Sequence, residues 1–229
     1  MSRIDEWFVP KIGPLRFRIF IGMLFLPYTG ICISFTIIGS LLTENVYWDR
    51  LYAITIIYFS GLGVSAHLFD AIGSKIKPWG NYFNEKYLLL IALISLILAY
   101  VIGIYYIITY SLYILAIIAI LEGFFLFAYN LELFNSRFHN NISFAFSWGS
   151  LPLLAGYFIQ TNQITLLPML VSLLTGALSY LEIKISKRYK EIKRNKSTNF
   201  KSYESILKIL TITIISTSFL LLINKMLND

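Results

Sequence analysis

Long hydrophobic stretches alternate with short polar segments along most of the chain. A helix needs roughly 20 apolar residues, each rising about 1.5 Å, to cross the hydrocarbon core of a bilayer. Residues 87–121 carry no charge but are too long for one crossing, so we divide this region near Gly103–Thr109. The pattern then predicts seven spans, at residues 19–42, 51–69, 87–107, 110–134, 142–160, 163–181 and 205–224. We therefore expect an all-α, polytopic membrane helical bundle that forms one transmembrane domain, 1–229.

The composition supports a membrane protein over a soluble one. Of the 229 residues, 57% are hydrophobic and only 14% are charged, whereas about 25% of a soluble domain is charged. The first apolar run is too long for a removable signal peptide. Cys32 is the single cysteine, which excludes an intrachain disulfide. The net charge of +7 suits basic loops at the membrane better than a nucleic-acid partner, and we expect no nucleic acid.

The positive charges predict the orientation of the bundle. Seven spans place all but two of the 19 Lys and Arg on the side of the N-terminus, the exceptions being Arg50 and Lys225. Because basic loops face the cytoplasm, we expect a cytoplasmic N-terminus in the cell membrane. The long basic loop 184–204 is interpreted as an orientation signal that also attracts anionic lipid headgroups. Its SKRYKEIKRNKS portion is either helical or disordered.

Two pairs of ionisable residues are the first candidates for chemistry. His67 with Asp70, and Glu132 with His139, each stand at the predicted cytoplasmic end of an apolar span. Ionisable groups are costly there, so each pair is a functional candidate. Residues three apart share a helix face, and so do residues seven apart if the helix continues. Imidazole and carboxylate together suit zinc, iron or manganese. The four side chains form a metal site or a structural polar cluster, or they are unpaired groups that reach the headgroup region.

Nearby cations suggest an anionic substrate. Lys75 and Lys77 follow Asp70, and Arg137 stands between Glu132 and His139. Such groups can bind a phosphate or diphosphate. The two lysines equally fit the positive-inside rule, and Arg137 can instead neutralise Glu132.

Two further residues attract attention by their position. Glu122 lies in the middle of a predicted span, where a carboxylate must be protonated, paired or in a wet cavity. It is a candidate proton relay or, alternatively, a helix-packing hydrogen bond. Trp148 is expected to be an anchor at the membrane interface.

Over roughly residues 14–86 the chain resembles the UbiA family of membrane prenyltransferases. The likeness rests on PLRFRIF at the start of the first span and on GLGVSAHLFDAIGSK at the end of the second. The first motif of that family, Asn-Asp-x-x-Asp-x-x-x-Asp, falls on Ala66, His67, Asp70 and Ser74. Its second motif falls on Glu132, Ser136 and Asn140. The chain has two spans between these motifs, where the family has about four.

The resemblance implies prenyl transfer from a prenyl diphosphate in a cavity that faces the cytoplasm. Asp70 and Glu132 would be the catalytic acids, and Asn140 would bind substrate with Lys75, Lys77 and Arg137. The family holds diphosphate through magnesium, which requires many oxygen ligands. Here His67 and His139 favour a transition metal instead. A divalent metal of either kind is the implied cofactor.

The leading hypothesis is therefore a membrane enzyme that acts on an isoprenoid or other lipid at the cytoplasmic leaflet. The alternatives are a carrier or transporter that uses Glu122 and the acid–histidine pairs as a relay, and a structural membrane subunit. The substrate and the acceptor are not specified by the sequence.

Overall fold

Seven long helical spans run through the protein, as the hydrophobic pattern predicts. The computed structural model describes residues 3–74, 79–80, 82–195 and 199–228. Within these residues, seven spans are long and apolar enough to cross a membrane: Leu15–Leu41, Trp48–Gly73, Glu85–Tyr110, Tyr113–Asn130, Asn141–Thr161, Leu166–Arg194 and Phe200–Asn228. Each overlaps one predicted span, so the expected all-α membrane bundle is confirmed.

Three of these spans are composed of several helical segments. The α-helices are α1 (Leu15–Met23), α2 (Leu26–Leu41), α3 (Trp48–Tyr58), α4 (His67–Gly73), α5 (Glu85–Tyr110), α6 (Tyr113–Asn130), α7 (Asn141–Ala145), α8 (Leu151–Thr161), α9 (Leu166–Arg194) and α10 (Phe200–Asn228). Two π-helical segments, Phe59–Ala66 and Phe146–Ser150, join α3 to α4 and α7 to α8. Such segments are rare and occur frequently at functional sites.

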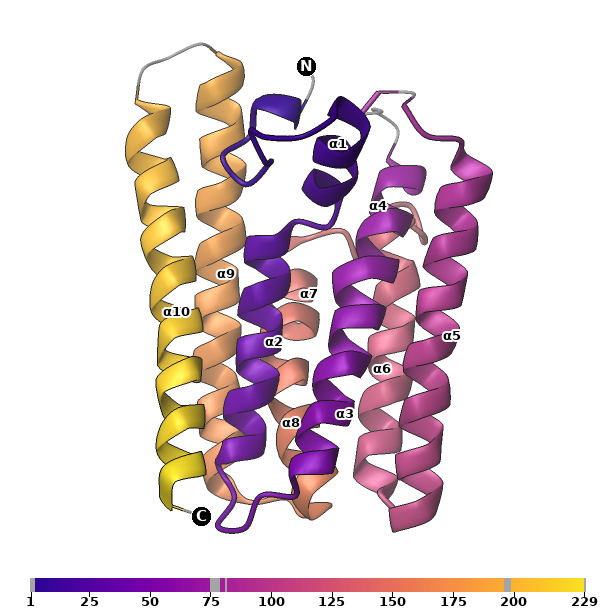
Figure 1. Cartoon of the computed structure of the whole chain (residues 1–229), viewed down its shortest axis with the longest axis vertical. Coiled ribbons are helices and arrows are strands. Elements are labelled where there is room, and N and C mark those ends of the chain that lie inside the picture. Colours follow the sequence, from indigo (N-terminus) through magenta and orange to yellow (C-terminus); the bar gives the residue numbers. More distant parts are fainter. Residues whose placement is uncertain (1–2, 75–78, 81, 196–198, 229) are drawn as a thin grey trace.

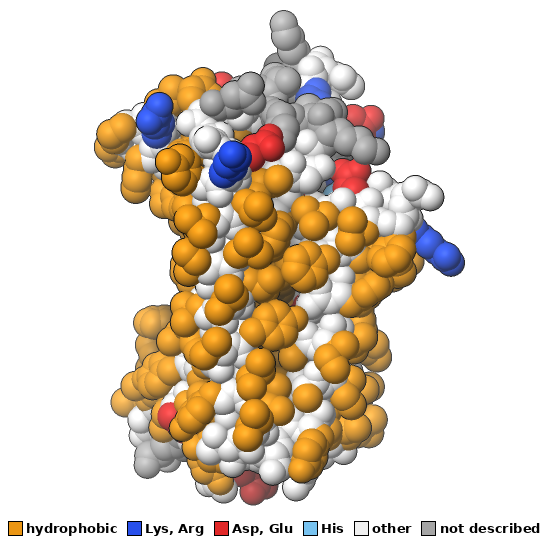
Figure 2. Space-filling view, turned by 90° about the vertical axis from the view of Figure 1, so that its right-hand side faces the viewer, with side chains coloured by type: hydrophobic (Ala, Val, Ile, Leu, Met, Phe, Trp, Pro, Cys, Tyr) orange, Lys and Arg blue, Asp and Glu red, His pale blue; other side chains and the backbone are white. Residues whose placement is uncertain are grey.

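The spans form one bundle with the two chain ends at opposite ends of its long axis (Figure 1). Helices α9 and α10 lie on one side, α5 and α6 on the other, and α2, α3 and α8 between them. The end at which the chain begins is called the N-terminal end below. The outer face near α5 and α6 is covered mostly by hydrophobic side chains, with its visible Lys and Arg at the N-terminal end (Figure 2). Lipid chains can cover such a face in a membrane.

The centre of the bundle is a close contact between α2 and α8. A Cβ on Gly39 would overlap the carbonyl oxygen of Leu153, and a Cβ on Gly156 would overlap that of Thr36. The Ser40 hydroxyl donates to the carbonyl of Gly156 at 3.0 Å across the same contact. Small residues let transmembrane helices approach until their backbones touch. This contact fixes the position of the buried Asn141–Thr161 span.

The first span, predicted over residues 19–42 with a kink at Pro27, is divided into two helices. It breaks between α1 and α2, where Phe25 has a φ of 44°. Pro27 lies in the first turn of α2, where its missing N–H costs nothing. The Thr29 hydroxyl donates to the carbonyl of Leu24 at 2.8 Å, which satisfies one carbonyl freed by the break. Phe25 thereby turns into the interior, at 6% exposure.

Three predicted boundaries need correction. Within the predicted basic loop 184–204, the helical alternative holds for the described residues 184–194, because α9 continues to Arg194, and α10 already begins at Phe200. Helix α6 ends at Asn130, four residues before the predicted boundary. The break in the long uncharged region falls at Ser111, whose left-handed conformation (φ 53°) ends α5. Hydropathy does not predict this part of α9, because the residues that follow the apolar run are mostly charged.

Candidate functional site

A polar pocket of about 480 Å³ opens at the N-terminal end of the bundle. Its wall combines basic, acidic, histidine and aromatic side chains from segments that are far apart in the sequence. The lining residues are Arg3, Phe25, Tyr28, His67, Asp70, Tyr129, Asn130, His139, Phe144, Trp148, Ile183, Lys187, Lys190, Glu191, Arg194 and Asn195. Both predicted histidines are among them, together with Asp70. The predicted convergence of the two histidines on one site is therefore observed.

The basic side chains of the pocket come mainly from α9. Lys187, Lys190 and Arg194 are spaced by three and four residues, which places them on one helix face toward the pocket. The Lys187 ammonium donates to the Oδ1 of Asn141 at 2.5 Å, which ties α9 to the start of α7. The Lys190 ammonium lies 5.9 Å from the centre of the Phe25 ring. Helix α9 thus supplies three cations to one wall.

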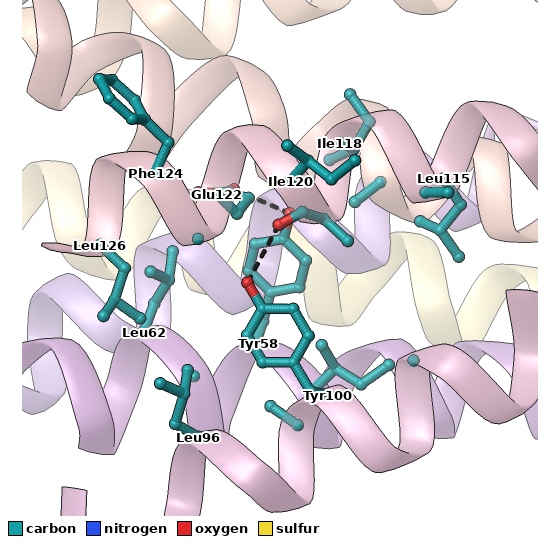
Figure 3. A pocket seen from close by; sticks show the side chains of 18 of the residues that line it. Tyr58, Leu62, Leu96, Tyr100, Leu115, Ile118, Ile120, Glu122, Phe124 and Leu126 are labelled. Atoms are coloured by element: carbon teal, nitrogen blue, oxygen red, sulfur yellow. Dashed lines mark hydrogen bonds between the residues drawn. The ribbon is translucent and has the colours of Figure 1, made fainter. Parts of the chain in front are cut away.

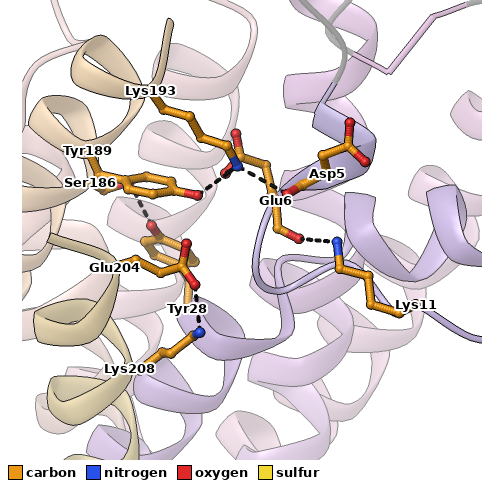
Figure 4. Close-up of polar contacts among 9 residues, drawn as sticks. All are labelled: Asp5, Glu6, Lys11, Tyr28, Ser186, Tyr189, Lys193, Glu204 and Lys208. Atoms are coloured by element: carbon orange, nitrogen blue, oxygen red, sulfur yellow. Dashed lines mark hydrogen bonds and ion pairs between the residues drawn. The ribbon is translucent and has the colours of Figure 1, made fainter. Parts of the chain in front are cut away.

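A fourth cation comes from the N-terminal segment, which is anchored to α9 (Figure 4). The Lys193 ammonium pairs with the Glu6 carboxylate at 3.2 Å and also donates to the Asp5 carbonyl and the Tyr189 hydroxyl. This anchor holds Arg3 over the aromatic floor, with its Cζ 5.3 Å from the centre of the Phe25 ring. Cations stack favourably on aromatic faces at this distance.

His67 is enclosed between two aromatic rings. Its imidazole stacks on Phe25 at 4.9 Å between ring centres and lies against Trp148 at the same separation. His67 is 8% exposed, and its Nε2 has no hydrogen-bond partner among the residues that the structure describes. A buried polar atom without a partner is rare in folded proteins and calls for an explanation. Trp148 is 4% exposed, so the predicted interface anchor is instead part of the pocket floor.

His139 and Asp70 present oriented polar atoms to the same space. The Nδ1 of His139 donates to the carbonyl of Tyr129 at 2.9 Å, and the imidazole stacks on the Tyr129 ring. This bond fixes the tautomer and leaves Nε2 as the acceptor atom. Asp70 is half-buried, one helical turn after His67 on α4. With Glu191, the pocket lining therefore holds two carboxylates and two imidazoles together with four cations.

Glu132 is not among the residues that line this pocket, although its charge acts on Asp70. Helix α6 ends at Asn130, so the helix that would return Glu132 and His139 to one face does not continue. Glu132 itself has a φ of 50°, and its carboxylate accepts a hydrogen bond from Ser136 at 3.1 Å. Phe134, Asn135 and Ser136 also have positive φ. The chain reverses through these residues and returns only His139 to the pocket wall.

The other predicted substrate-binding residues have different positions. Arg137 is exposed on the reversing segment and does not line the pocket. Asn140 caps α7, because its Oδ1 accepts from the backbone N–H groups of Ile142 and Ser143 at 2.9 Å each. Lys75 and Lys77 lie outside the described residues.

The metal hypothesis gains no geometric support. In the described part of the chain, no group of three or more His, Cys, Asp or Glu side chains is placed to hold a metal ion. The donor set also fits magnesium poorly, because only Asp70 and Glu191 offer carboxylates at this pocket. A metal held by His67, Asp70, Glu132 and His139 therefore stays a prediction, and no step below depends on it.

Glu122 belongs to a second, apolar cavity lower in the bundle. This cavity of about 690 Å³ lies between α3, the π-helical segment that follows it, α5 and α6 (Figure 3). The Tyr58 hydroxyl donates to the Oε1 of Glu122 at 2.9 Å. Glu122 is therefore paired, which is one of the arrangements expected for an acid in the middle of a span.

The residues that sequence reasoning missed are Arg3, Lys187, Lys190 and Arg194. Their charges were assigned to orientation, and those of the last three also to attraction of anionic lipid headgroups, yet the spacing of these three was visible as one helix face. Arg3 had no such signal, because its position depends on contacts between Glu6 and Lys193 that are far apart in sequence. Glu182, buried at 4% exposure beside the lining residue Ile183, was not singled out either.

Comparisons of the chain with models of protein families, with curated proteins and with solved structures gave no match. The chemistry that the polar pocket can perform therefore follows from the residues that line it. Four cations at the rim of an apolar bundle suit an anionic group that is attached to a hydrophobic molecule.

Proposed function

We propose that the protein binds a lipid with a phosphate or diphosphate headgroup in the polar pocket, and that this end of the bundle faces the cytoplasm. One observation carries the proposal: Arg3, Lys187, Lys190 and Arg194 line one pocket at the end of a membrane bundle. The same end carries nearly all the Lys and Arg of the chain, which supports the cytoplasmic orientation.

The balance of charge favours an anion. The four cations outnumber the carboxylates of Asp70 and Glu191, so the pocket has an excess of positive charge even with neutral histidines. Phosphate oxygens accept charge-assisted hydrogen bonds from Lys and Arg, and the guanidinium fork of Arg can bind two of them. Like charges this close repel one another, and a bound anion relieves that repulsion.

The floor of the pocket suits the carbon atoms next to such a headgroup. Phe25, Phe144 and Trp148 are each less than 10% exposed and line the inner wall. The Phe144 and Trp148 rings stack nearly parallel, 5.5 Å apart. An apolar chain that leaves the headgroup can therefore bury surface against aromatic faces before it reaches lipid.

The reaction we propose is transfer of the isoprenoid group of a prenyl diphosphate, which the resemblance to the UbiA family favours. The acceptor would bond to the first prenyl carbon, the carbon–oxygen bond would break, and the diphosphate would leave with the electron pair. The four cations would stabilise its charge. Nε2 of His139 would take the acceptor's proton, since its Nδ1 is already committed to Tyr129.

The test is equilibrium binding of radiolabelled farnesyl diphosphate to the purified protein in lipid nanodiscs. We expect Lys190→Ala and Arg194→Ala each to weaken binding by about tenfold or more, because a hydrogen bond to a charged group is worth roughly 1.5–3 kcal/mol. Lys184→Ala is the matched control, since Lys184 is exposed on the same helix but does not line the pocket.

Equal affinity in all three variants and the wild type would refute the proposed binding site. Release of inorganic diphosphate in the presence of an acceptor then separates a transferase from a carrier. Binding without release for any acceptor would favour the carrier.

A further inference from the structure

The apolar cavity has polar groups at only three of its lining side chains. Tyr58, Tyr100 and Glu122 are set among aliphatic, aromatic and glycine residues from α3, α5 and α6. Exposed Ile104, Ile120 and Phe124 are part of its lining, so the cavity meets the outer apolar face of the bundle. Its volume of about 690 Å³ is within the range of small-molecule sites, roughly 300–1,000 Å³.

The two tyrosine hydroxyls already have partners. Tyr58 donates to the Oε1 of Glu122, and Tyr100 donates to the carbonyl of Ala119 at 3.2 Å (Figure 3). Gly123 makes room for the second bond, because a Cβ at this position would overlap the Tyr100 hydroxyl. Neither hydroxyl is therefore free to donate a hydrogen bond to the second carboxyl oxygen of Glu122.

The second carboxyl oxygen of Glu122 remains without a partner. Its Oε2 is buried and makes no hydrogen bond in the described residues. A buried polar atom without a partner costs free energy. If Glu122 served only to pack α6 against α3, its bond to Tyr58 would be sufficient and this cost would have no purpose. An acyl chain of the surrounding lipid could fill the cavity but could not bond to this oxygen.

We propose that the cavity binds an uncharged apolar molecule with one hydroxyl group, which bonds to Oε2 of Glu122. A hydroxyl can donate and accept, so it satisfies this oxygen in either protonation state of the carboxyl. The absence of Lys and Arg from the lining excludes an anionic headgroup here. An uncharged molecule can dissolve in the hydrocarbon core and enter from the side. This site is separate from the polar pocket and does not depend on its proposed function.

The experiment is photo-crosslinking of the protein in lipid vesicles by a diazirine derivative of 1-hexadecanol. Unlabelled 1-hexadecanol and heptadecane, an alkane that can neither donate nor accept a hydrogen bond, compete for the site. We expect the alcohol to compete about tenfold better than the alkane in the wild type, as one buried hydrogen bond predicts. We expect cross-links in α5 and α6.

Three variants test the role of the carboxyl. Glu122→Leu should reduce the preference for the alcohol to about twofold or less, whereas Glu122→Gln, which keeps hydrogen-bonding atoms, should retain it. Lys190→Ala, in the other pocket, should also retain it, so failure of this proposal is distinguishable from failure of the phosphate site. Equal competition by the alcohol and the alkane in the wild type would overturn the proposal, even if no variant at Glu122 folds. An unchanged preference in a folded Glu122→Leu protein would also overturn it.

Discussion

At the residue scale, the sequence predicts that His67 belongs to a functional site, but only the structure shows which side chains surround it. Its position beside Asp70 at the end of an apolar span marked it as a functional candidate, and both residues line the pocket. The rings that enclose it were not predictable, because Phe25 reaches it through a helix break and Trp148 through a π-helical segment. Glu132 shows the opposite case. Its predicted place on one helix face with His139 required α6 to continue past it, whereas α6 ends two residues earlier, at Asn130.

The surroundings of His67 yield a prediction about stability and binding. His67→Phe keeps an aromatic ring between Phe25 and Trp148 and removes an unpartnered Nε2, whose burial costs about 1–3 kcal/mol. We expect the thermal-unfolding midpoint of the variant to equal or exceed that of the wild type, while its affinity for farnesyl diphosphate falls. A midpoint lower by more than about 5 °C, with affinity unchanged, would make His67 a packing residue.

At the scale of elements, the bundle is specified by small residues as much as by hydrophobic ones. The seven apolar runs predict the spans, but they do not say which helices touch. Gly39 and Gly156 let α2 and α8 pack closely, because a side chain at either position would overlap the backbone of the other helix. Helix α9 illustrates a different limit. Its charged half reads as a loop by hydropathy, although three of its cations follow the spacing of one helix face.

The contact between α2 and α8 makes a matched pair of substitutions informative. Gly156→Ala places a methyl group against the backbone of Thr36, and we expect it to destabilise the protein by about 2–3 kcal/mol. Gly103→Ala is the control. Its Cβ would meet nothing closer than Ile57 at 3.8 Å, and alanine favours the helix by about 1 kcal/mol. Denaturation in detergent should therefore separate the two variants, and equal stabilities would contradict the proposed helix contact.

At the scale of the whole molecule, the distribution of charge has two separate causes. Arg50 and Lys225, the exceptions to the positive charge at the N-terminal end, have local roles. The Arg50 guanidinium donates to the carbonyls of Ile159 and Gln160 and lies over the Tyr110 ring, and Lys225 donates to the carbonyl of Glu44. The remaining cations serve the proposed orientation, and four of them also form the pocket. Sequence patterns predict the orientation from these charges. They do not predict the pocket, which requires the tertiary contacts that bring Arg3 to α9.

The most direct test of the phosphate site is a lysine footprint of the unmodified protein in nanodiscs. An amine-reactive ester labels exposed lysines with and without farnesyl diphosphate, and mass spectrometry measures the labelling of each one. If the ligand binds in the polar pocket, we expect it to protect Lys187 and Lys190, which line the pocket. We expect no protection of Lys184 or Lys201, which do not line the pocket. Protection of none of these lysines, or equal protection of all four, would contradict binding in the polar pocket.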